Sequence, residues 1–80
     1  MLTVYSKANC HFCDKAKYLL KTKGVQFNEV RVDLDSNARE FLISQGHRNV
    51  PQIYKDGMIF VEGFKGLTLL DDSIFQQLKG

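Results

Sequence analysis

The sequence has only two cysteines and one proline, lacks tryptophan, and contains no long hydrophobic run. Its apolar stretches are a few residues long, whereas a membrane-spanning helix needs about 20 apolar residues. The segment from Met1 to Tyr5 also lacks the charged start and apolar stretch of a signal peptide. We therefore expect no membrane association and place the chain in the cytoplasm.

Charge of one sign is not in large excess either. Eleven Lys and Arg residues face nine Asp and Glu residues, and the formal net charge is +2. The basic residues are scattered, which is not the electrostatic footprint of a nucleic-acid-binding protein, so we expect no nucleic-acid partner. A chain of 80 residues has room for one domain. We predict a single domain over residues 1–80, present as a monomer.

The two cysteines, Cys10 and Cys13, lie three positions apart. A secreted domain stabilised by disulfides usually has more pairs that join distant segments. A disulfide that closes so short a loop removes little entropy from the unfolded chain. Stabilisation of the fold by a disulfide is therefore a poor explanation for the two cysteines, and their spacing indicates either redox chemistry or metal binding.

The first third of the chain alternates between strand and helix patterns. Residues 2–6 are rich in β-branched and aromatic residues and predict a strand. Apolar residues at helical spacing predict a helix from about Cys10 to Lys23, with Gly24 as its stop. Residues 25–32 predict a second strand, with an irregularity near Asn28 because the apolar positions on its two sides are out of phase.

The middle of the chain predicts a helix followed by a hairpin. Asp35 or Ser36 can cap the helix, which we expect to end at Gly46. The two apolar stretches 52–55 and 58–61 follow the only proline, and an Asp-Gly pair separates them. That pair is the strongest short signal for a two-residue hairpin, so these strands should be antiparallel.

The C-terminal part predicts one more helix. Gly63 and Gly66 interrupt the pattern, and Thr68 with Asp71 three residues later can start the helix. The predicted order is βαβαββα. A right-handed parallel βαβ unit extended by an antiparallel hairpin gives a four-stranded mixed sheet with three helices, which is the thioredoxin-like class of α/β fold.

The predicted helix start favours a reactive Cys10. The free backbone N–H groups and the positive end of the helix dipole stabilise a thiolate there and lower the pKa of the thiol. Lys7 adds a nearby cation, whereas Asp14 acts weakly in the other direction. Cys13 lies one turn deeper on the apolar face. We predict that Cys10 attacks a disulfide and that Cys13 resolves the mixed disulfide.

Other interpretations of these residues are open. His11 either tunes the thiols and contacts a partner or is an exposed side chain, and Phe12 is either a contact surface or local packing. The two cysteines could also form half of a zinc site completed by His11 and His47. Closed zinc sites usually repeat a spaced ligand pair, and the sequence has no second pair, so we predict no metal site.

Three separated motifs resemble the glutaredoxin family along nearly the whole chain. They are Cys10-His11-Phe12-Cys13, Asn49-Val50-Pro51 and Gly63-Phe64. The resemblance implies a glutaredoxin fold and thiol-disulfide oxidoreductase activity. It also implies that Pro51 is cis and opposes the cysteines, and that the Val50 backbone pairs with an extended partner.

The chain departs from the family pattern at three places. Glutaredoxins typically have Thr, Gly-Gly and Ser/Thr-Asp in place of Asn49, Glu62-Gly63 and Lys65-Gly66. In the family, the Asp of the third motif receives the ammonium group of glutathione, and here Gly66 replaces it. Lys7 and Arg48 can still meet a carboxylate, so glutathione remains a candidate reductant.

The segments 46–51 and 62–65 also resemble the glutaredoxin-like hydrogen donors of ribonucleotide reductase, which thioredoxin reductase reduces. We predict a dithiol oxidoreductase that carries electrons to protein disulfides, with ribonucleotide reductase as a candidate substrate and no bound cofactor. Glutathione or thioredoxin reductase would supply the electrons. The alternatives are a glutathione-dependent glutaredoxin acting on glutathionylated substrates and a metal or iron–sulfur module on the same thiols. Besides Cys10 and Cys13, the predicted substrate or glutathione contacts are Lys7, His11, Phe12, Arg48, Val50, Pro51, Gly63 and Phe64.

Overall fold

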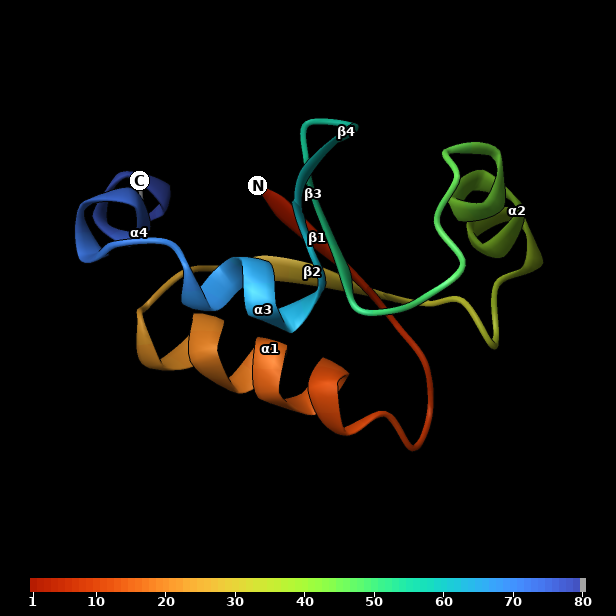
Figure 1. The fold of residues 1–80 in the computed structure, drawn as a ribbon, viewed down its shortest axis with the longest axis horizontal. Helices are drawn as coiled ribbons and strands as arrows, with labels where there is room; N and C mark the ends of the chain where they lie inside the picture. The colour runs from red at the N-terminus through yellow and green to blue at the C-terminus, as the bar shows by residue number, and fades with distance from the viewer. Residues whose placement is uncertain (80) are drawn as a thin grey trace.

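The computed structural model describes residues 1–79 and contains four strands and four helices (Figure 1). The strands are β1 (Leu2–Ser6), β2 (Phe27–Arg31), β3 (Gln52–Lys55) and β4 (Met58–Glu62). The helices are α1 (His11–Thr22), α2 (Ser36–Ser44), α3 (Gly63–Thr68) and α4 (Asp72–Leu78). Within residues 1–79, no helix is long and apolar enough to cross a membrane.

The four strands form one mixed sheet in the order β2-β1-β3-β4. β1 and β2 are parallel, and α1 connects them. β3 is antiparallel to both β1 and β4. This arrangement confirms the predicted thioredoxin-like fold and the antiparallel hairpin.

The hairpin turn has the predicted residues in the required conformation. Asp56 and Gly57 have φ angles of +52° and +82°. A type I′ turn needs positive φ at both central residues, which Asp and Gly tolerate better than most residues. The turn therefore sets the pairing of Lys55 with Met58 at the start of the hairpin.

The predicted strand irregularity near Asn28 is wrong. Residues 27–31 of β2 pair with residues 2–6 of β1 in an unbroken register. Phe27 and Val30 are out of phase because they point to opposite faces of the same regular strand, and β2 ends before Val32. The register shift in this sheet lies instead between β3 and β4.

The ends of α1 and α2 agree with the predicted signals. Cys10 is the N-cap of α1, and Asp35 is the N-cap of α2, where its Oδ1 accepts the N–H of Ala38 at 3.0 Å. Gly46, with φ +84°, lies directly beyond the end of α2. The side-chain caps therefore set where these two helices begin.

The C-terminal prediction of one helix starting at Thr68 is wrong. Residues 63–68 form the additional helix α3, and α4 begins after Asp71, whose Oδ1 accepts the N–H of Ile74 at 3.2 Å. Gly66 does not interrupt α3 but lets it lie close to β4. A Cβ atom at Gly66 would be 3.0 Å from Cβ of Val61.

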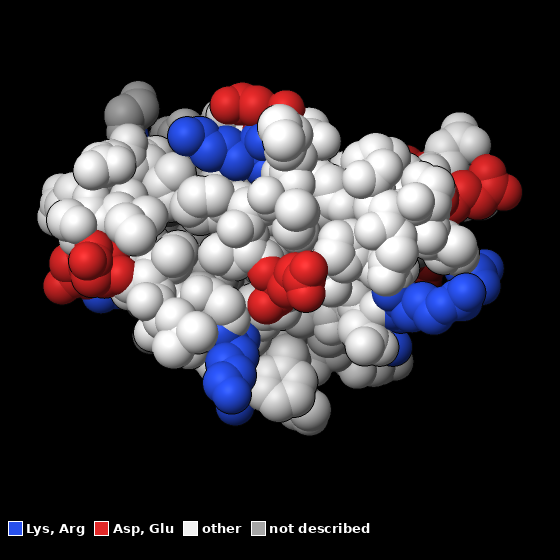
Figure 2. All heavy atoms as spheres, turned by 45° about the horizontal axis from the view of Figure 1, so that its top comes forward, with Lys and Arg blue, Asp and Glu red and all other residues white. Residues whose placement is uncertain are grey.

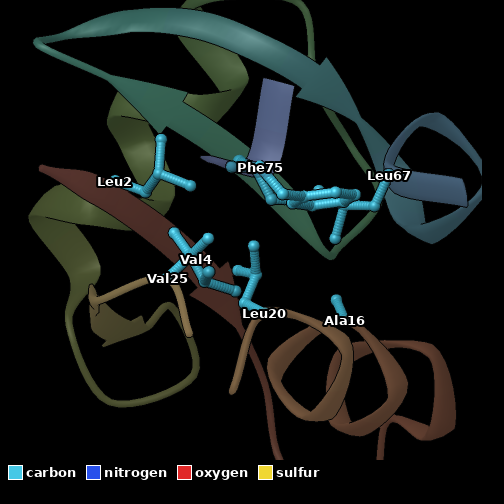
Figure 3. Packing of buried hydrophobic residues seen from close by; sticks show 8 residues of the cluster. Leu2, Val4, Ala16, Leu20, Val25, Leu67 and Phe75 are labelled. Carbon is cyan, nitrogen blue, oxygen red and sulfur yellow. The ribbon is translucent and has the colours of Figure 1, made fainter. Parts of the chain in front are cut away.

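The main core lies between the sheet and the helices α1, α3 and α4 (Figure 3). Side chains alternate along β1, so that Leu2 and Val4 face this core. On the opposite side of the sheet, the Tyr5 and Tyr54 rings pack against Phe41 of α2, with centroid distances of 6.0 and 5.4 Å. The buried members of the main cluster are Leu2, Val4, Ala16, Leu20, Val25, Ile53, Leu67 and Phe75.

Candidate active site

Cys10 and Cys13 form a disulfide at the start of α1, with their Cα atoms 5.2 Å apart. Sγ of Cys10 accepts the backbone N–H of Cys13 at 3.2 Å, as expected for an N-cap. The Cys13 side chain is fully buried, whereas Cys10 is half-buried. Of the two sulfurs, that of Cys10 is therefore the one open to a reaction partner.

The loop before β3 lies against this disulfide. The Val50-Pro51 peptide bond is cis, as the resemblance implies. Sγ of Cys10 lies 3.9 Å from the carbonyl oxygen of Val50. The N–H of Gly63 donates to the carbonyl oxygen of Pro51 at 3.1 Å, so the start of α3 is attached to the same loop. Residues that are far apart in the sequence thus meet around Cys10.

Two aromatic rings lie at the side of the site that α1 and α3 share. The Phe12 and Phe64 rings stack with their centroids 6.2 Å apart and an interplanar angle of 29°. Nζ of Lys15 lies 5.4 Å from the Phe12 ring centroid. The Phe12 residue remains 59% exposed. The predicted contact residues Phe12 and Phe64 are therefore neighbours and form an exposed apolar surface.

A pocket of about 600 Å³ adjoins the other side of the loop. It includes three of the predicted contact residues, Lys7, Arg48 and Val50. Arg39 of α2 is a further cation in its wall. The remaining lining residues are Val32, Asp33, Leu34, Ser36, Leu42, Ile43, His47 and Asn49. Its positive side chains give the pocket the chemistry to bind a carboxylate.

Asp33 is an acidic member of this pocket, and it is already paired. Its two carboxylate oxygens accept hydrogen bonds from Nε and Nη2 of Arg31, with lengths of 2.7 and 2.5 Å. This pairing lowers the pKa of Asp33 to about 2. Asp33 also accepts the N–H of Ala8 at 3.3 Å, in the loop that leads to Cys10. The Arg31 pair therefore fixes an ionised carboxylate that supports the active-site loop.

The two histidines do not join this site in the way that a zinc site requires. His11 is exposed at the first position of α1, whereas the His47 ring packs against Tyr54 with a centroid distance of 6.0 Å. Among the residues that the structure describes, no group of three or more His, Cys, Asp and Glu side chains could hold a metal ion. The alternative zinc site thus has no ligand set in this part of the chain.

Three residues near the site were not predicted from the sequence. Lys15 follows Phe12 by three positions, and this helical spacing could have indicated their contact. The position of Arg39 in the pocket depends on how α2 packs, which no short motif shows. Gln52 is buried, and its Nε2 donates to the carbonyl oxygen of Asn49 at 2.8 Å, which holds the loop before β3.

Comparisons with known proteins agree with this site. The glutaredoxin family model matches residues 2–60. Glutaredoxin 3 of Escherichia coli (strain K12) is 39% identical over 69 residues, which cover 85% of this chain and 82% of that protein. The glutaredoxin-like protein NrdH of Lactococcus lactis subsp. cremoris (strain MG1363) is 40% identical over 65 residues, which cover 81% of this chain and 89% of that protein.

A solved structure shows the same similarity. NrdH-redoxin from Escherichia coli superposes with a TM-score of 0.74 at 25% sequence identity, covering 96% of this chain and 92% of that one. The match therefore extends over the fold as well as over the motif that contains the two cysteines. With its Cys10–Cys13 disulfide at the start of α1, the chain belongs to the glutaredoxin family and is a thiol-disulfide oxidoreductase.

Proposed function

We propose that this protein carries electrons to protein disulfides through Cys10 and Cys13 and is itself reduced by thioredoxin reductase. The observation that carries the choice of reductant is Gly66, which replaces the acid that receives the ammonium group of glutathione in related glutaredoxins. The structure leaves little room for an acid there, because a Cβ atom would lie 3.0 Å from Cβ of Val61. The neighbouring Lys65 is a cation, which repels an ammonium group.

In the proposed reaction, the Cys10 thiolate attacks one sulfur of the partner's disulfide. A bond forms between Cys10 and the partner while the partner's S–S bond breaks and its first thiolate leaves. The Cys13 thiolate then attacks the Cys10 sulfur and releases the second partner thiolate. Two electrons pass to the partner, and solvent transfers the two protons from the chain's thiols to the partner's thiols. The reductase, using NADPH, then reduces the Cys10–Cys13 disulfide.

The relatives support this assignment of the reductant. NrdH-redoxin of Escherichia coli is described as having a thioredoxin-like activity profile, and a second NrdH protein is 40% identical to this chain. The resemblance to hydrogen donors of ribonucleotide reductase makes that enzyme our proposed substrate. We further propose that the thiols work without a bound metal or cluster, which metal analysis and visible absorbance of the purified protein would test.

A glutathione-dependent activity is the second candidate, because two observations favour it. Lys7, Arg39 and Arg48 line the pocket beside Val50, where they can bind the carboxylate at the other end of glutathione. Glutaredoxin 3 of Escherichia coli (strain K12) is also 39% identical to this chain. In this second function, Cys10 alone would be enough to attack a glutathionylated substrate.

A coupled assay separates the two candidates. The oxidised protein is supplied with NADPH, a protein disulfide as the final electron acceptor, and either thioredoxin reductase or glutathione with glutathione reductase, and NADPH consumption is followed. We expect turnover with thioredoxin reductase and little with the glutathione system, while a Cys10→Ser control loses both. Efficient turnover with glutathione and glutathione reductase, but not with thioredoxin reductase, would contradict the proposed reductant.

A further inference from the structure

Exposure of an aromatic ring to water is unfavourable in free energy. An exposed ring beside a reactive disulfide therefore suggests that it binds another molecule. Phe64 packs against the main core, and Phe12 stacks on Phe64, so the exposed ring is held in place before any partner arrives. Interface residues that contribute most to binding are often rigid aromatic side chains, because little side-chain freedom remains to be lost. Phe12 has these properties and directly precedes Cys13.

A cation lies beside the Phe12 ring, and a second lysine follows Phe64 in the sequence. These residues are Lys15 and Lys65. Within the described part of the chain, neither lysine has an ion-pair partner at 4.0 Å or less. The acid of the same helical turn, Asp14, lies 3.6 Å from Nζ of Lys17 instead. The lysines can therefore attract an acidic group from another molecule.

On the face that Figure 2 shows, the charges do not form one large patch of one sign. Figure 2 shows Lys and Arg in separate groups, with uncharged atoms and acidic groups between them. A partner is therefore selected by local contacts near the disulfide and much less by the net charge of +2.

We propose that Phe12, Lys15, Phe64 and Lys65 form a docking patch for a protein segment that has an apolar residue and an acidic residue next to its reducible disulfide. The apolar side chain lies against the Phe12 ring, and the carboxylate lies near the lysines. Glutathione has carboxylates but no large apolar side chain, so the patch favours protein disulfides over glutathione disulfides. This inference rests on the proposed function and adds the chemistry of the segment that is bound.

Synthetic peptides test the charge part of the patch. Each peptide has one internal disulfide, flanked by Phe and Glu, by Phe and Lys, or by Ser and Glu. The protein is reduced, freed of reductant and mixed with each peptide, and the rate of peptide thiol release is measured in a single turnover. We expect wild type to reduce the Phe-Glu peptide roughly threefold to tenfold faster than the Phe-Lys peptide at low salt.

Charge reversal assigns this preference to Lys15. Lys15→Glu should lower the Phe-Glu to Phe-Lys rate ratio by about twofold to fivefold. Lys21→Glu is the matched control, because Lys21 is an exposed lysine in the last turn of the same helix, and it should keep the wild-type ratio. Each ratio is taken within one protein, so a change in Cys10 reactivity cancels.

The aromatic part is tested with Phe12→Ala, which should reduce the Phe-Glu to Ser-Glu ratio by more than about fivefold. Thermal unfolding of each variant checks that it is folded, and Phe12→Leu should recover part of the ratio. Ratios near one in wild type, or ratios that the variants do not change, would overturn the docking patch. If the wild-type protein reduces neither the peptides nor a protein disulfide, the proposed function itself is wrong.

Discussion

The two sulfurs of the active site have different surroundings although only three positions separate their residues. Cys10 is half-buried before the first turn of α1, where its Sγ accepts the N–H of Cys13. Cys13 has no exposed surface and lies on the face of α1 that also holds Ala16 and Leu20. In the reduced chain we therefore expect the helix start to stabilise a thiolate on the outer sulfur and burial to protect the inner one.

Limited alkylation of the reduced protein tests this difference. With less than one equivalent of iodoacetamide, we expect Cys10 to be labelled first, because only its sulfur is open to the reagent. Peptide mass spectrometry locates the label. Full alkylation after unfolding in denaturant is the control, and preferential labelling of Cys13 would show that the assigned roles are wrong.

Glu29 is the residue for which we predict an effect of pH on stability. Its Oε2 accepts hydrogen bonds from Nζ of Lys17 at 2.8 Å and from Oγ of buried Ser6 at 2.6 Å. These bonds lower the pKa of Glu29 from its ordinary value of 4.5. Because the pKa is lower in the folded chain, ionised Glu29 stabilises the fold above about pH 4.5. This contribution is lost as the pH falls through the folded-state pKa.

Urea unfolding at several pH values measures this contribution. Glu29→Gln should lower stability at neutral pH and make the loss of stability below about pH 4.5 smaller than in wild type. Asp33, with a pKa of about 2, leaves some pH dependence in the variant. Parallel stability curves for the variant and wild type over this range would exclude the proposed role of Glu29.

At the scale of elements, the sequence predicted the four strands and the helices α1 and α2, and it predicted a last helix whose start was wrong. The strands, α1, α2 and the hairpin have apolar periodicity, a cap or an Asp-Gly turn. α3 was missed because it has two glycines in six residues and forms through burial of Leu67, which has no exposed surface. In the site, the motif residues were predictable, whereas the pocket position of Arg39 depends on tertiary packing.

Gly66→Ala tests whether α3 needs a glycine. Alanine is normally better than glycine in a helix by about 1 kcal/mol, but overpacking against Val61 costs about 1 to 3 kcal/mol. We expect a net loss of about 1 kcal/mol, measured by urea unfolding. An increase in stability would mean that Val61 moves aside and that the close contact does not determine the residue.

Asp71→Ala tests the start of α4. Loss of an N-cap side chain costs about 0.5 to 2 kcal/mol, which lowers Tm by roughly 2 to 16 °C in a chain of this size. Asp71→Asn should keep most of the stability, since its amide oxygen can also accept the N–H of Ile74. If Thr68→Ala lowered the stability more than Asp71→Ala, that result would support the helix start at Thr68 that the sequence predicted.

At the scale of the whole molecule, the sheet brings together chemistry from three distant parts of the chain. The loop after β1 contains Cys10, the loop before β3 contains Val50, and α3 contains Phe64. Figure 1 shows α1 and α3 side by side, with α2 apart from them. The aromatic rings belong to α1 and α3, whereas the basic pocket is lined mainly by α2, the segment before it and the loop before β3. The cytoplasmic location stays a prediction.

The most direct test of the account is to trap the mixed disulfide. Reduced Cys13→Ser is mixed with the Phe-Glu disulfide peptide, and intact-mass and peptide mass spectrometry identify any covalent adduct. After rapid alkylation of the free thiols, which prevents the peptide's second thiol from attacking the mixed disulfide, we predict a peptide adduct on Cys10, whereas wild type should release both peptide thiols and end with its Cys10–Cys13 disulfide. Failure of Cys13→Ser to form an adduct, or an adduct formed equally well by Cys10→Ser, would contradict attack by Cys10 and resolution by Cys13.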